Sequence, residues 1–145
     1  MADVVLGFDG SPSSRTALYV AIEQAKQFGD RLVVVFGDEP PGRSAGEEFG
    51  EHRRVLEERG KGLLDEAAGA AREAGVEVET LLVPRKPAVA LEGVARERGA
   101  RLIVVGTYGE GPFRSAILGS TPHKLLHVSD VPVLCVPAEG QRGRG

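Results

Sequence analysis

The sequence is poor in the residues and segments on which several protein classes depend. It has one cysteine in 145 residues, which rules out an intramolecular disulfide framework and suits a reducing compartment. It shows no signal-peptide pattern and no apolar run long enough to cross a bilayer. With a net charge of −3, it also lacks the basic surface that nucleic acids and anionic membranes attract. We therefore expect a cytoplasmic protein that binds neither nucleic acid nor membrane.

Several catalytic motifs are missing as well. The P-loop pattern G-x-x-x-x-G-K-[S/T] does not occur, and no G-x-G-x-x-G follows a predicted strand. These absences argue against motor-type NTPases and dinucleotide enzymes. None of the three histidines stands near a nucleophile elbow, so a hydrolase triad finds little support. A receiver domain phosphorylated on Asp9 would need an acidic pair after the first strand, whereas residues 9–12 read Asp-Gly-Ser-Pro.

Five short apolar runs, rich in β-branched residues, alternate with longer segments of helical periodicity. This alternation predicts an α/β fold, a single doubly wound sheet of five parallel strands with helices on both faces. We place this domain at residues 1–138 and expect residues 139–145 to form a flexible tail. Pro132 and the polar start of the third run mark the third and fifth strands as sheet edges. The runs are Val4–Phe8, Leu32–Phe36, Val76–Val83, Leu102–Val105 and Val131–Val136.

Four segments with helical periodicity lie between or after these runs, bounded by glycine, proline or capping residues. The segment before the second helix is a loop, because it is rich in proline and glycine. The helices are expected from Ser13 or Ser14 to Gly29, over residues 47–74 after a loop at 38–46, from Pro87 to near Gly99, and from just after Gly119.

The most unusual residues follow the first and fourth strands. Gly7-Phe8-Asp9-Gly10-Ser11 ends the first strand, Gly106-Thr107-Tyr108-Gly109 ends the fourth, and Gly119-Ser120-Thr121 stands at a helix start. Ligands of open parallel sheets bind beyond the carboxyl ends of the strands. Glycines let the backbone approach an anion, and a helix N-terminus offers unpaired N–H groups. The pattern suits a phosphate site; alternatively, the glycines only form a tight turn, and Ser120 or Thr121 only caps a helix.

The spacing of Gly106, Gly109, Gly119 and Ser120, G-2x-G-9x-G-[S/T], resembles the ATP-binding motif of the universal stress protein family. The opening Asp9-Gly10-Ser11 and the final apolar run resemble that family too, so the resemblance covers residues 2–137. It implies a Rossmann-like sheet in strand order 3-2-1-4-5, similar to adenine nucleotide α-hydrolases. It also implies that ATP, with Mg²⁺ on its phosphates, lies across the ends of strands one and four.

The resemblance further implies which residues approach the nucleotide. Asp9 and the backbone near Phe36 would approach the adenine and ribose, and Val105 and Gly106 would line the ribose. Arg114 either reaches a phosphate, which Arg binds bidentately, or has a surface role. The phosphates would be held by Gly109, Gly119, Ser120 and Thr121. The complete cofactor-binding set is Gly7, Phe8, Asp9, Phe36, Val105, Gly106, Gly109, Arg114, Gly119, Ser120 and Thr121.

Two residues depart from the family's pattern. Pro122 stands where a residue with a free N–H is common, and it therefore removes one possible phosphate donor. Tyr108 stands between the glycines where histidine is common, and it either packs over the ligand or faces solvent. Neither departure removes the motif.

The remaining candidate residues have plainer interpretations. His123 and His127 are four residues apart and share a helix face, a spacing that can bind a metal. Because no third ligand is evident, we interpret them as solvent-facing or packing side chains, and we predict no metal site built from side chains. His52 lies in a polar helix and is interpreted as solvated. Cys135 lies in an apolar strand and is interpreted as a small hydrophobe rather than a nucleophile.

These observations predict an ATP-binding regulatory protein of the stress response with slow or no ATP hydrolysis. Near the motif, only Asp9 and the less well placed Glu110 could act as a general base. A rival interpretation is an interaction module that keeps the fold without the nucleotide; Pro122 favours it, and the intact glycines oppose it. An enzyme of the α-hydrolase type would need a further domain. The apolar edge Val131–Val136, which family members pair across a two-fold axis, predicts a homodimer.

Overall fold

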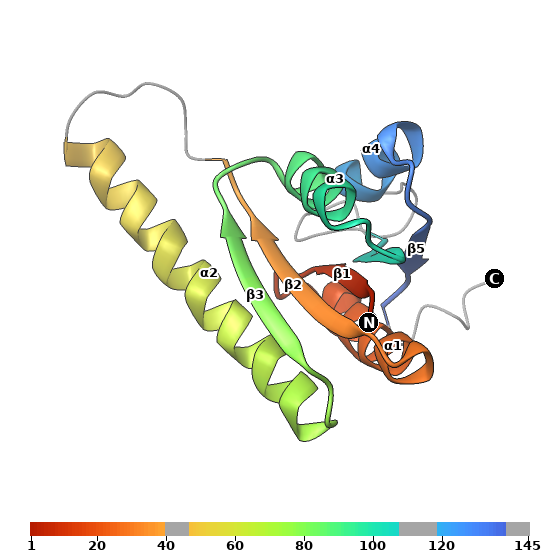
Figure 1. Cartoon of the computed structure of the whole chain (residues 1–145). Helices are drawn as coiled ribbons and strands as arrows, with labels where there is room; N and C mark the ends of the chain where they lie inside the picture. The colour runs from red at the N-terminus through yellow and green to blue at the C-terminus, as the bar shows by residue number, and fades with distance from the viewer. Residues whose placement is uncertain (40–46, 108–118, 139–145) are drawn as a thin grey trace.

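A five-stranded parallel sheet forms the centre of the computed structural model, which describes residues 1–39, 47–107 and 119–138. The strand order is β3-β2-β1-β4-β5, and each neighbouring pair is parallel (Figure 1). This order confirms the predicted fold class and the edge positions of the third and fifth strands. The strands are β1 (Asp3–Gly7), β2 (Arg31–Gly37), β3 (Val78–Val83), β4 (Leu102–Gly106) and β5 (Val133–Val136).

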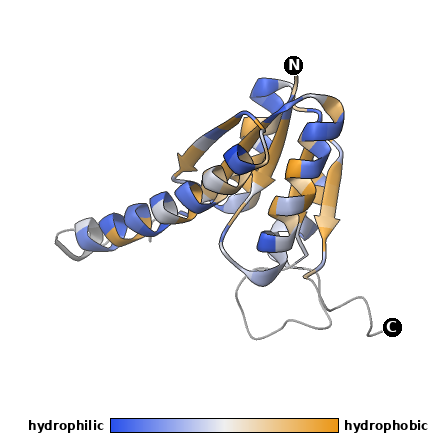
Figure 2. Cartoon of the chain, turned by 90° about the horizontal axis from the view of Figure 1, so that it is seen from below, coloured by the Kyte–Doolittle hydropathy of each residue, from blue (hydrophilic) through white to orange (hydrophobic). Residues whose placement is uncertain are grey.

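Helices cover both faces of the sheet, because successive strand residues point to opposite faces and both faces are apolar. Val4 and Leu6 of β1 are buried in the core formed with α1 and α2, whereas Val5 is buried in the core formed with α3 and α4. The strands are hydrophobic, and the outer faces of the helices carry the hydrophilic residues (Figure 2). The helices are α1 (Pro12–Phe28), α2 (Glu47–Glu73), α3 (Pro87–Arg98) and α4 (Ser120–Val128).

Local signals account for most helix ends. Gly29 and Gly99 have the left-handed conformation, with φ of 67° and 58°, and close α1 and α3 as predicted. The start of α1 was placed slightly too late, since Pro12 begins the helix. Ser11 is the N-cap, and its hydroxyl accepts a hydrogen bond from the Ser14 N–H.

Two strands begin later than the sequence predicts, at Val78 and Val133 instead of Val76 and Val131. The Val76 N–H donates to the carbonyl of Ala71 at 3.0 Å, so Val76 belongs to the closure of α2 rather than to β3. Val131 is held in a turn by the Ser129 hydroxyl, which accepts from the Val131 N–H at 3.0 Å and donates to the Val131 carbonyl at 2.7 Å. Both strands therefore begin two residues later, because these valines bond to preceding residues.

Two buried aspartates mark the amino end of the sheet. Asp3 pairs with Arg31 at 2.9 Å, and Asp30, with its side chain only 1% exposed, pairs with Arg101. Asp30 also accepts a hydrogen bond from the Ala2 N–H at 3.1 Å. The Arg101 guanidinium, bonded to this carboxylate, holds the pKa of Asp30 below its ordinary value. This end of the sheet is therefore tied together by ion pairs.

Some expectations fall outside the residues that the structure describes. They are the tail at 139–145, most of the loop at 38–46, and Tyr108, Gly109, Glu110 and Arg114. Within the three described segments, no helix is both long and apolar enough to cross a membrane.

Candidate functional site

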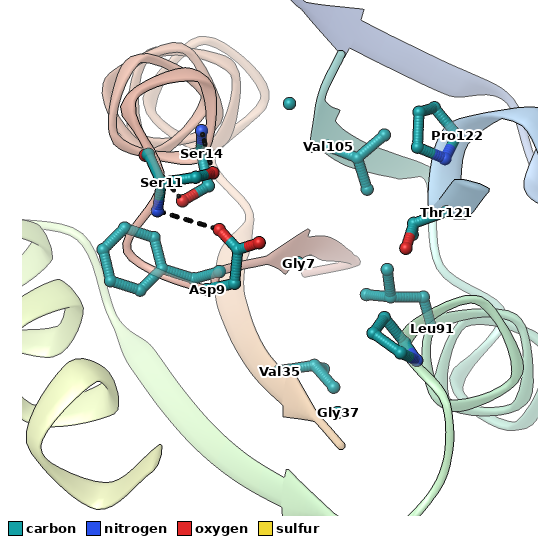
Figure 3. Close-up of a pocket in the computed structure, with 13 residues that line it drawn as sticks. Gly7, Asp9, Ser11, Ser14, Val35, Gly37, Leu91, Val105, Thr121 and Pro122 are labelled. Atoms are coloured by element: carbon teal, nitrogen blue, oxygen red, sulfur yellow. Dashed lines mark hydrogen bonds between the residues drawn. The ribbon is translucent and has the colours of Figure 1, made fainter. Parts of the chain in front are cut away.

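A pocket opens at the carboxyl end of the sheet, between the ends of β1 and β4 (Figure 3). From β1 the chain continues to β2 and β3 on one side, and then crosses to β4 and β5 on the other. This reversal of strand order separates the loops and leaves a crevice, the usual ligand position in such folds. The pocket is lined by Gly7, Phe8, Asp9, Ser11, Ser14, Val35, Gly37, Pro87, Leu91, Val105, Gly106, Thr121 and Pro122.

The pocket is partly enclosed. Its cavity volume is about 70 Å³, below the roughly 300–1,000 Å³ of small-molecule sites, and the space measures about 480 Å³ when open solvent at the mouth is included. A ligand the size of a nucleotide would therefore lie largely in the open mouth.

Asp9 lies at the pocket in a turn with a defined geometry. Its Oδ1 accepts a hydrogen bond from the Ser11 N–H at 2.9 Å, the Asx turn expected of aspartate before a helix. Gly10 has a φ of 81°, which favours glycine because it has no Cβ. The Arg15 Nε donates to the Gly10 carbonyl at 3.0 Å, and the Arg15 guanidinium pairs with Glu66 of α2. Arg15 thus ties this turn to α2, a role that the sequence analysis missed.

Three glycines at strand ends allow helices to approach the pocket closely. A Cβ on Gly106 would stand 2.8 Å from the backbone carbonyl carbon of Ser13, at the start of α1. A Cβ on Gly7 would stand 2.8 Å from Leu91 Cδ1, and one on Gly37 would stand 3.0 Å from Pro87 Cα. The contact at Gly106 is too short for a real Cβ, because its neighbours include backbone atoms of α1. The contacts at Gly7 and Gly37 are tight, and at Gly7 the neighbour is the end of a side chain that can rotate.

The start of α4 forms the wall opposite Asp9, and the Thr121 side chain faces the pocket (Figure 3). Gly119 is the N-cap and makes no side-chain capping bond, so the alternative in which Ser120 or Thr121 caps the helix is wrong. The N–H groups of a first helical turn have no acceptor within the helix, and they carry a partial positive charge. Because Pro122 has no N–H, the donors there are those of Ser120 and Thr121.

The structure brings most of the described candidates together. The pocket is lined by Gly7, Phe8, Asp9, Val105, Gly106 and Thr121 of the predicted set. Gly119 and Ser120 stand at the start of α4, outside the lining. The Phe36 side chain is buried on the α1 and α2 face, and its neighbours Val35 and Gly37 line the pocket instead.

Other lining residues were not predicted. The strand periodicity could have placed Val35 and Gly37 on the opposite side from Phe36. Pro87 had a signal too, since the helix that it starts must follow the carboxyl end of β3. Leu91 carries no sequence signal, because its position depends on how α3 packs against Gly7.

Comparison with known proteins adds independent evidence. The model of the universal stress protein family matches residues 1–137. A universal stress protein of Thermus aquaticus is 36% identical over 137 residues, which cover 92% of this chain and 96% of the relative. Two solved structures are each 29% identical to this chain. One is a family member from Burkholderia pseudomallei, with a TM-score of 0.76, covering 94% of this chain and 96% of that one. The other is a universal stress protein in complex with cAMP, with a TM-score of 0.73, covering 93% of this chain and 96% of that one.

Proposed function

The chain belongs to the universal stress protein family, and on that premise we propose that the pocket between β1 and β4 binds ATP together with Mg²⁺. The observation that carries this proposal is the pairing of a carboxylate with a helix N-terminus across one pocket (Figure 3). Asp9 supplies acceptors on one side, and the first turn of α4 supplies donors on the other. The relative in complex with cAMP, at 29% identity, supports an adenine nucleotide.

The residues present fit such a ligand. The adenine and ribose would lie against Val35, Val105 and Asp9, where the wall combines apolar carbons with one carboxylate. The phosphates would lie at the start of α4, near the N–H groups of Ser120 and Thr121. Mg²⁺ would be held through phosphate oxygens, since the described residues offer no cluster of three His, Cys, Asp or Glu side chains for a metal.

The site favours binding over catalysis. Asp9 is the one ionisable residue among those that line the pocket, and one of its oxygens already accepts the Ser11 N–H. Phosphoryl transfer requires positive groups that stabilise the transferred phosphoryl, and no described lining side chain supplies one. We therefore propose a regulatory nucleotide-binding protein with slow or no hydrolysis.

A cytoplasmic location is part of the proposal, because a reducing compartment suits a protein with a single free cysteine. Burial raises the pKa of the Cys135 thiol, which disfavours the reactive thiolate. Cys135 is half-buried in β5. This environment supports its interpretation as a hydrophobic side chain rather than a nucleophile.

We also propose that β5 pairs with a second copy of the chain. Among the described strands, β5 is a sheet edge with β4 as its one neighbour, and Val133, Leu134 and Cys135 are half-buried. An apolar edge with unpaired backbone groups tends to be covered. Light scattering at micromolar concentration should give twice the chain mass, and a monomer there contradicts this part of the proposal.

The test of the nucleotide site begins with the purified protein. Denaturation should release ATP, and stripped protein should bind ATP with Mg²⁺ in a calorimetric titration. Gly119→Leu should abolish binding, because a bulky side chain would stand where the phosphates approach. Its φ of −58° suits any residue, so this variant should fold. Thr80→Val, on the exposed edge of β3, is the matched control and should bind normally.

Two outcomes would overturn the proposal. Unchanged affinity in Gly119→Leu would remove the phosphate position. The absence of both released nucleotide and binding heat would favour the rival interpretation, an interaction module of the same fold. Pro122 favours that interaction-module interpretation, because it leaves the start of α4 with one N–H donor fewer. Parallel titrations with ADP, AMP and cAMP would identify which adenine nucleotide binds best.

A further inference from the structure

Two histidines lie together on the outer surface of α4. The ring centroids of His123 and His127 are 4.9 Å apart, and the ring planes make an angle of 70°. Both side chains are exposed. Pro122 and Leu125 are the buried residues of this helix, and helical periodicity puts the two histidines on the opposite side.

Nothing else in the described structure accounts for this pairing. No hydrogen bond or ion pair joins either imidazole to another described residue. Lys124 and Leu126, which lie between them in the sequence, are exposed too. Two imidazoles therefore stand side by side with their ring nitrogens available to solvent or to a ligand.

The spacing of the rings matches that of two ligands on one metal ion. Metal–nitrogen bonds to histidine are about 2.0–2.1 Å long, which places the ion roughly 3.2 Å from each ring centroid. With a nitrogen–metal–nitrogen angle of about 100°, the centroids would be roughly 5 Å apart. The observed separation is 4.9 Å, with the rings edge to face, so the centroid distance already fits, and rotation of the two side chains would bring one nitrogen of each ring to the ion.

Contrary to the expectation from the sequence that side chains build no metal site, we propose that His123 and His127 bind one divalent transition-metal ion, each through one imidazole nitrogen. Imidazole ligands suit Cu²⁺, Ni²⁺ and Zn²⁺, and affinity should be highest for Cu²⁺. The part of the chain that the structure describes holds no group of three metal-ligating side chains, so water completes the coordination sphere. Mg²⁺ prefers oxygen ligands, which makes this site distinct from a metal held by nucleotide phosphates.

An ion at this position would bridge one turn of α4. The same helix supplies Thr121 and Pro122 to the pocket wall, so the ion would stabilise an element of the nucleotide site without touching the ligand. An ion that binds only the folded chain raises its stability by mass action. At a free concentration of about a hundred times its Kd, the midpoint of thermal unfolding should rise by about 5–10 °C.

The test uses untagged, full-length protein treated with a chelator and titrated with Ni²⁺ in the absence of nucleotide. We expect one ion per chain. His123→Gln and His127→Gln should each weaken binding at least about tenfold, since even the loss of a group that only orients a ligand costs about 10–100-fold. His52→Gln changes the third histidine, which is exposed on α2, and is the matched control with unchanged binding.

A spectroscopic measurement identifies the ligands directly. With Cu²⁺, electron paramagnetic resonance should show two imidazole nitrogens in the wild-type protein and fewer in each variant of the pair. Unchanged Ni²⁺ binding in the double variant, equal loss in His52→Gln, or no saturable binding would each overturn the proposal. All three positions are exposed, so the variants should match the wild type in metal-free thermal unfolding. ATP binding has no part in these measurements, so its failure would leave them unaffected.

Discussion

Replacing Gly106 with alanine places one methyl group where β4 meets the start of α1. An ideal Cβ at this position would stand 2.8 Å from both the Cβ and the carbonyl carbon of Ser13, and nearer still to the Ser13 Oγ. Carbon atoms pack best at about 3.5–4.0 Å. The strand and the helix would therefore have to separate by roughly half an ångström or more. The same shift would move Ser11 and Ser14, which line the pocket.

The energetic cost of the substitution depends on which neighbouring atoms can move away from the new methyl group. Overpacking of this kind costs about 1–3 kcal/mol, and the upper end applies because the neighbours of the new methyl include backbone atoms, which cannot rotate away. Natural domains have free energies of unfolding of about 5–15 kcal/mol, so Gly106→Ala should still fold. A ligand that needs the original pocket would lose affinity by at least tenfold if about 1.4 kcal/mol of that strain must be relieved on binding.

Urea unfolding and calorimetric titration with ATP measure the two effects on the same variant. Gly62→Ala is the control, because nothing lies within 4 Å of a Cβ added there on α2. That change should raise stability by up to about 1 kcal/mol, the helix propensity difference between the two residues, and leave affinity unchanged. If Gly106→Ala matched the wild type in both assays, the close contact and its role in shaping the pocket would be refuted.

Two further substitutions test other contacts. Asp30→Asn should lower the free energy of unfolding at pH 7 by about 1–3 kcal/mol, because the ionic hydrogen bond to Arg101 is lost. The folded-state pKa of Asp30 lies below its ordinary value, so this stabilisation is present at neutral pH and is lost as the pH falls through the folded pKa. Between pH 7 and pH 3, the free energy of unfolding measured in urea should therefore fall less in the variant than in the wild type. Arg15→Gln should weaken ATP binding severalfold with little change in the unfolding midpoint, since it releases the carbonyl of Gly10. Arg53→Gln, a control on α2, should bind ATP normally. Equal affinities of the two variants in calorimetry would contradict this role for Arg15.

Two helix ends were predicted correctly because one residue type specifies each of them. Gly29 and Gly99 end helices because each takes a left-handed conformation that closes the last turn. The starts of β3 and β5 were wrong because Val76 and Val131 look like strand residues in isolation. Their backbone groups bond to Ala71 and Ser129 instead, and apolar patterning does not show where a hydrogen bond goes.

The pocket was predictable as a location but not as a list of residues. Parallel strands bring their carboxyl ends to one edge, so Asp9, Gly106 and Thr121 could be placed together from the sequence. Strand alternation separates Val35 from Phe36, but the sequence does not show on which side of β2 the pocket opens, and it is Val35 that lies there. Leu91 depends on the packing of one helix against a strand end, a tertiary contact that periodicity does not encode.

Carboxylates at the two ends of the sheet are satisfied in different ways. At the amino end, Asp3 and Asp30 are buried against arginines, so their charges are neutralised within the fold. At the carboxyl end, Asp9 pairs with no arginine or lysine among the described residues, and its Oδ1 accepts only the Ser11 N–H. A charge kept unpaired beside a pocket contributes little to stability and leaves an acceptor for a ligand. The ion pairs therefore stabilise the amino end of the sheet, while the Asp9 carboxylate and the start of α4 remain available to bind a ligand at the carboxyl end.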